Sequence, residues 1–115
     1  MSAMFRDDDA VAISGHNIRS LRELLSAHGG LVTLEKVPHG GYVRRYSFEA
    51  LVSIAIIAEI KRSTSLNLKQ AAIFVRDHRH GTEQYLVIYM SSCATVQIDC
   101  GQIGAWVLGA VKSAA

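Results

Sequence analysis

The most apolar stretch of the chain runs from Leu51 to Ile60 and is interrupted by Ser53 and Glu59. Ser47, a residue type that caps helix N-termini, stands shortly before it, so the pattern predicts a long apolar helix that extends to about Arg62. The stretch is well short of the roughly 20 residues needed to cross a bilayer, so we expect no membrane span. Half of the 115 residues are hydrophobic and 19% are charged, a composition that predicts one compact folded domain.

Local boundary signals predict three further helices in the first two-thirds of the chain. Asp7 to Ser14 forms a short acidic helix that ends at Gly15. Asn17 caps a second helix that runs to about His28 and ends at the glycine pair 29–30. Asn67, with Gln70 three residues later, forms a capping box that starts another helix to about Arg76.

A hairpin is predicted between the second helix and the apolar one. Residues 31–35 and 42–46 alternate in a strand-like manner, and Pro38, Gly40 and Gly41 form the turn between them. Residues 84–91 are apolar on both alternating faces, which predicts a strand covered on both sides. A half-exposed strand over 95–99 follows, and then a helix over 102–112 whose apolar stripe contains Ile103, Trp106, Val107 and Ala110. The expected fold is mainly α with small β elements, divided into a domain at 5–79 and a strand–strand–helix unit at 80–115.

Charge is distributed unevenly along the chain. Residues 36–79 carry eight basic and three acidic side chains, a net charge of +5, whereas residues 81–115 hold only Glu83, Asp99 and Lys112 as charged groups. Only the front part can therefore attract a polyanion. Asp7, Asp8 and Asp9 stand where a secretory signal would need a basic start, so we expect a cytoplasmic location.

Residues 8–77 resemble the DNA-binding domain of MerR-type transcriptional regulators. The matching segments are Gly15, Arg19-Ser20-Leu21-Arg22, Gly30-Leu31, His39-Gly40-Gly41-Tyr42-Val43-Arg44-Arg45-Tyr46-Ser47, Leu51 with Ile54, and Leu66-Asn67-Leu68 with Ala71. The resemblance implies a winged helix-turn-helix that binds double-stranded DNA as a homodimer, with the second helix in the major groove and the hairpin, or wing, on the flanking backbone. Glu23 and Leu24 stand where the family has an aromatic pair, and residues 83–115 lack the heptads of its coiled coil.

The residues expected to contact DNA lie on the second helix and the wing: Asn17, Arg19, Ser20, Arg22, Lys36, His39, Arg44, Arg45 and Tyr46. Because neighbouring side chains of a strand point to opposite faces, we expect one of Arg44 and Arg45 to meet DNA and the other to pair locally. Three alternatives stay open: the helix arginines are only solvated, Lys36 and His39 are ordinary loop residues, and Tyr46 is a core ring with a solvated edge.

The neutral C-terminal unit offers a possible dimer surface. Its candidate contacts are Tyr85, Val87, Tyr89 and Trp106. It could equally complete the core of a single copy, or dock another protein, which makes a protein-interaction module the alternative function.

Other classes of function find little support in the sequence. The pair Cys93 and Cys100 has no third ligand nearby, so we expect reduced thiols that pack and neither a metal site nor a cofactor. The chain also lacks a glycine-rich phosphate loop, a His-Glu-x-x-His motif and a nucleophile elbow, so we expect no enzymatic activity.

Overall fold

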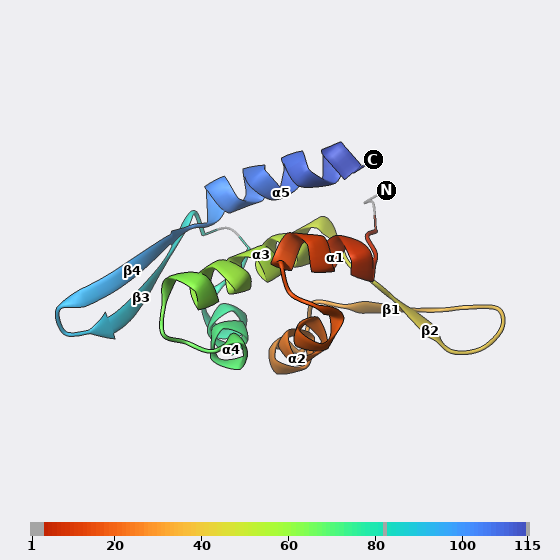
Figure 1. The fold of residues 1–115 in the computed structure, drawn as a ribbon, viewed down its shortest axis with the longest axis horizontal. Coiled ribbons are helices and arrows are strands. Elements are labelled where there is room, and N and C mark those ends of the chain that lie inside the picture. Colours follow the sequence, from red (N-terminus) through yellow and green to blue (C-terminus); the bar gives the residue numbers. More distant parts are fainter. Residues whose placement is uncertain (1–3, 82, 115) are drawn as a thin grey trace.

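The computed structural model describes residues 4–81 and 83–114. Its elements are α1 (Asp7–Ser14), α2 (Ile18–His28), β1 (Thr33–Lys36), β2 (Tyr42–Arg45), α3 (Phe48–Ser63), α4 (Leu68–His78), β3 (Tyr85–Ser91), β4 (Ala94–Asp99) and α5 (Cys100–Ala114). The strands form two separate antiparallel pairs, β1 with β2 and β3 with β4. The described chain is mainly helical with two small sheets, as the sequence predicts for the fold class (Figure 1).

The core is built around α3. Its side chains from Ala50 to Ala58 are all buried, and so is Ile60. α1, α4 and α5 pack against α3, while α2 packs mainly against α4 (Figure 1). None of the helices in the described ranges has both the length and the apolarity that a membrane crossing requires.

The helix ends confirm the predicted capping residues. The side-chain oxygens of Asn17 and Ser47 accept hydrogen bonds from the backbone three residues later, at 2.9 and 3.1 Å. Asn67 and Gln70 form the reciprocal capping box, with bonds of 2.8 and 2.9 Å. Gly15 closes α1 at φ 71°, a left-handed conformation that side-chain-bearing residues rarely adopt. Local chemistry therefore sets most helix boundaries.

The β1–β2 hairpin projects from one end of the molecule (Figure 1). All four residues of β1 are exposed, whereas Leu31, expected in this strand, is buried in the core before the strand begins. At the other end of the hairpin, Tyr46 and Phe5 exchange two backbone hydrogen bonds of 2.7 and 2.8 Å. This bridge ties the start of α1 to the base of the hairpin.

The β3–β4 ribbon extends from the opposite end of the long axis, in a molecule of 55 × 26 × 23 Å (Figure 1). Leu86 and Ile88 are buried, but Tyr85, Val87 and Tyr89 on the other face of β3 are exposed. The expectation of a strand covered on both sides is therefore wrong, because within the described residues only one layer packs against the ribbon.

α5 lies along α3 with Val107 fully buried and with Ile103 and Ala110 packed beside it. Trp106 is 55% exposed. The predicted apolar stripe therefore holds for three of its four members, whereas the tryptophan lies at the partly exposed edge between α5 and α1.

Candidate nucleic-acid interface

The outer face of α2 presents basic side chains to solvent. Arg19 and Arg22 are exposed one turn apart, with Glu23 beside them, while Leu21, Leu24 and Leu25 are buried on the inner face. Within the described residues, neither arginine forms an ion pair with a carboxylate. Both guanidinium groups are consequently available to an incoming ligand.

Asn17 and Ser20 are used by the helix itself. The Asn17 side chain accepts the hydrogen bond from the Ser20 backbone, and Ser20 is half-buried. These two candidate contacts therefore set the start of α2 and the direction in which Arg19 and Arg22 project.

The tip of the hairpin carries the other exposed candidates, Lys36 and His39. Gly40 and Gly41 follow, at φ 87° and 83°, so the turn needs two successive left-handed residues that glycine adopts without steric cost. Cross-strand pairing places Tyr42 opposite Lys36, and Tyr42 is 66% exposed. Tyr42 is absent from the residues that the sequence predicts to contact DNA, and strand alternation gives no signal for it: it lies four positions before the buried Tyr46, on the same strand face. Its ring is exposed because the hairpin projects from the molecule (Figure 1).

Arg44 is held at the base of the hairpin by Asp7. Its Nε and Nη2 donate to the two carboxylate oxygens of Asp7 at 3.0 and 2.8 Å. This fork holds the pKa of Asp7 below its ordinary value, and the hydroxyl of Tyr46 and the charge of Arg22 lower it further. Arg44 is thus committed to a neighbour on α1.

Arg45 points to the other face of the hairpin, where its Nε donates to Glu35 at 2.8 Å. Its Nη1 is buried without a hydrogen-bond partner among the described residues. Both wing arginines pair locally, because each strand face has a carboxylate within reach. That one of them meets DNA stays a prediction.

Tyr46 is a core residue with no exposed surface. Its hydroxyl donates to Asp7 at 2.5 Å, and burial together with this bond raises the pKa of the phenol. Tyr46 is therefore a core ring, the alternative left open by the sequence, and its buried hydroxyl is not accessible to DNA. Tyr46 instead fixes Asp7, and through Asp7 it positions Arg44.

Around Asp7 the molecule thus joins three elements. Arg44 comes from β2 and Asp7 from α1, and Arg22 of α2 lies close enough to act on the same carboxylate. A hollow of about 330 Å³ lies beside them, lined by Arg6, Asp7, Asp8, Val43, Arg44 and Arg45. α2 and the base of the hairpin therefore both adjoin α1.

The candidate dimer residues lie away from this site. Tyr85, Val87 and Tyr89 are 48%, 42% and 79% exposed on the ribbon, and Trp106 faces a groove beside α5. Cys93 is exposed in the ribbon turn and Cys100 is buried at the start of α5, both as free thiols. The expectation that both thiols pack in the interior is therefore confirmed for Cys100 and wrong for Cys93.

No known protein family, curated protein or solved structure matches this chain.

Proposed function

We propose that the chain is a sequence-specific DNA-binding transcriptional regulator of MerR-like type. In this proposal α1 and α2 form the helix-turn-helix, α2 enters the major groove, and the β1–β2 wing lies on the flanking backbone. The observation that carries the proposal is the double hydrogen bond from Arg44 to Asp7, which joins β2 to α1, while α2 packs against the same helix α1. A duplex could contact both elements at once.

The exposed stripe of α2 has the composition of a base-reading surface. Arg19, Arg22, Glu23 and Ser26 follow the helical spacing and are all exposed. Arginine can donate two hydrogen bonds to guanine, and a glutamate can accept one from the amino group of cytosine. The stripe is about 10 Å long at 1.5 Å per residue, which spans a few base pairs.

Ion pairing ranks the arginines within the proposed interface. Arg19 and Arg22 can bind DNA without giving up a carboxylate within the described part of the chain. Arg44 and Arg45 must first exchange Asp7 and Glu35 for a phosphate, which offsets much of what the new contact contributes. We therefore expect α2 to contribute more of the affinity than the wing arginines.

The test begins with selection of bound duplexes from a random pool, followed by fluorescence anisotropy on the selected duplex at several salt concentrations. Arg19→Ala and Arg22→Ala should each lower the affinity about tenfold, whereas Arg45→Ala should lower it less. If the replaced arginine contacts a phosphate, its removal should also reduce the slope of log affinity against log salt concentration by about 0.9 in magnitude.

Lys112→Ala on α5 is the matched control, because it removes one positive charge from an element on the other side of α1 and α3 (Figure 1). It should leave the affinity within about twofold. If no duplex is selected at low salt, or if the two α2 variants bind like Lys112→Ala, the regulator proposal fails.

The ribbon supports two further proposals. Three exposed apolar side chains, Tyr85, Val87 and Tyr89, alternate along one face of β3, and such a row is a candidate surface for a second copy. Light scattering should give the mass of a dimer, and Val87→Ser with Tyr89→Ser should reduce it to that of one chain. Should duplex selection fail while a protein partner depends on Tyr89, the interaction-module alternative takes its place.

A further inference from the structure

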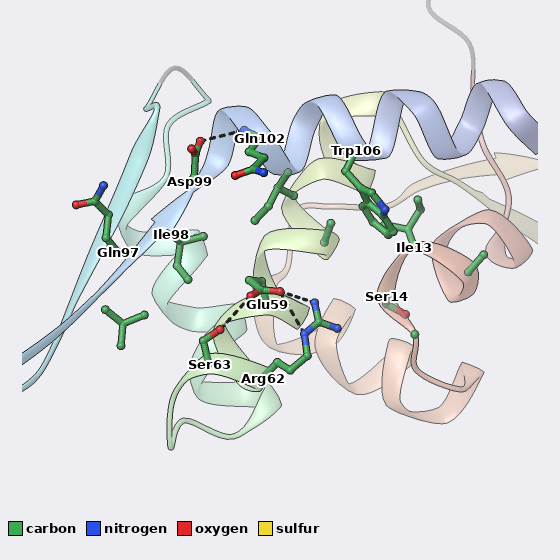
Figure 2. Close-up of a pocket in the computed structure, with 15 residues that line it drawn as sticks. Ile13, Ser14, Glu59, Arg62, Ser63, Gln97, Ile98, Asp99, Gln102 and Trp106 are labelled. Carbon is green, nitrogen blue, oxygen red and sulfur yellow. Dashed lines mark hydrogen bonds and ion pairs between the residues drawn. The ribbon is translucent and has the colours of Figure 1, made fainter.

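A groove separates the C-terminal helix from the first and third helices. It has a volume of about 740 Å³ and lies between α1, α3, β4 and α5. Its size falls within the range of small-molecule sites, roughly 300 to 1,000 Å³. Figure 2 shows the residues of these four elements that line it. The proposed DNA contacts do not line it.

One end of the groove is apolar and aromatic. Trp106 projects from α5 toward Ile13 of α1, and the indole is 55% exposed (Figure 2). Ile103 and Ala55 add apolar surface to the same groove. An exposed indole face beside aliphatic side chains is a surface on which a flat ring packs well.

The other end carries a carboxylate whose charge is not matched. Asp99 caps α5 by accepting a hydrogen bond from the Gln102 backbone at 2.9 Å. Among the described residues, no lysine, arginine or histidine lies within ion-pair distance of Asp99. The second carboxylate of the groove, Glu59, is already bound by Arg62 and Ser63 (Figure 2). The three charged side chains that line the groove, Glu59, Arg62 and Asp99, carry a net charge of −1.

The spacing of these two ends sets the length of a ligand. Asp99 ends β4 directly before α5, and Trp106 lies about two turns further along that helix; both residues line the groove. Their separation along α5 is about 10 Å at 1.5 Å per residue. A single small ring on Trp106 cannot reach Asp99, whereas a ring with a chain of several atoms can.

We propose that this groove binds an elongated aromatic amine, with the ring on Trp106 and the protonated amine at Asp99. Apolar packing supplies contact area, and the carboxylate selects a cation because an anionic or neutral head group leaves its charge unmatched. The site stands apart from the DNA contacts and does not depend on the proposed regulator function.

The probe is 4-phenylbutylamine, compared with 4-phenylbutanol, 4-phenylbutanoate and the shorter benzylamine. Binding is measured on the full chain without DNA, by the rise in Tm and by the emission of Trp106, the only tryptophan of the sequence. The long amine should bind saturably with a Kd of roughly 1 mM, as expected for so small a ligand. The other three compounds should bind at least about fivefold more weakly.

Three variants separate the site from general charge attraction. Asp99→Asn retains a capping oxygen but removes the charge, so it should weaken the amine about fivefold and leave the alcohol unchanged. Ala12→Phe, on the exposed rim of the groove, should weaken all four compounds because the ring occupies their space. Asp77→Asn on α4 removes an equal charge outside the groove and should change nothing.

Some results would overturn the proposal even if every variant folds. These are absence of saturation at concentrations tenfold above the expected Kd, equal binding of the amine and the carboxylate, and equal behaviour of Asp99→Asn and Asp77→Asn. Unchanged binding to Ala12→Phe would overturn it as well, because the amine would then lie elsewhere.

Discussion

Replacement of Asp7 by asparagine removes the group that joins α1, the hairpin and the core. Asp7 receives two hydrogen bonds from Arg44 and one from Tyr46. Hydrogen bonds to a charged group contribute about 1.5 to 3 kcal/mol, but the Asp7 side chain is 36% exposed, so the lower end applies. A loss of about 1.5 kcal/mol in the free energy of unfolding lowers the Tm of a chain of 115 residues by about 6 °C.

Asp8→Asn is the matched control, since Asp8 also lies in the first turn of α1 and thus shares the favourable interaction with the helix dipole. The Tm difference between the two variants, measured by circular dichroism at pH 7, isolates the contacts with Arg44 and Tyr46. Because the folded pKa of Asp7 lies below 3.8, its contribution is complete above about pH 5 and is lost as the pH falls through the folded value. Equal Tm values for Asp7→Asn and Asp8→Asn at neutral pH would refute the role of Asp7.

Three other predictions concern the histidines, the hairpin turn and base recognition. Burial and nearby cations lower the pKa values of His16 and His28 from 6.5, so the stability of the fold should decrease as the pH falls below that value. The double variant His16→Gln, His28→Gln should show a smaller decrease in Tm between pH 7.5 and 5.5, and an undiminished decrease would contradict this assignment. Gly41→Ala places a side chain at φ 83° and should lower the free energy of unfolding by about 1 to 2 kcal/mol. Gly104→Ala in α5, where a Cβ meets no atom within 4 Å, should instead raise it by up to about 1 kcal/mol. Thermal unfolding measures both changes, and a change of the same sign in the two variants would contradict the prediction. Glu23→Gln should shift one selected base from cytosine toward adenine in a repeated duplex selection, and an unchanged site would place Glu23 outside the groove.

The sequence predicts the elements well where the signal is local. Asn17, Ser47 and Asn67 each cap a helix by a hydrogen bond that spans three residues, and such a bond depends on little outside its own segment. Each of these helices therefore begins at the position that its cap predicts. The helix C-termini differ more, because α4 continues to His78 and α5 to Ala114.

The apolar run at 84–91 does not indicate which face of β3 is buried. Tyr85, Val87 and Tyr89 are as apolar as Leu86 and Ile88, so periodicity cannot distinguish a strand between two layers from one that covers a single layer. The structure packs α3 and α5 near one side of the ribbon and nothing from the described chain on the other. Burial in a strand of this kind depends on tertiary packing, which no local pattern contains.

The candidate site depends still more on contacts between distant parts of the sequence. A count of charges over residues 36–79 gives +5 and predicts a segment that attracts a polyanion. Yet all five ion pairs among the described residues use arginines of this segment: Arg44, Arg45, Arg62, Arg76 and Arg79. The partner of Arg44 lies 37 residues away and reaches it only because Phe5 and Tyr46 bridge the two segments. Since a paired arginine must exchange one anion for another, we expect its net contribution to the proposed DNA binding to be small. Within the proposed function, the structure therefore favours Arg19 and Arg22 as the source of affinity, because within the described chain neither of them forms an ion pair.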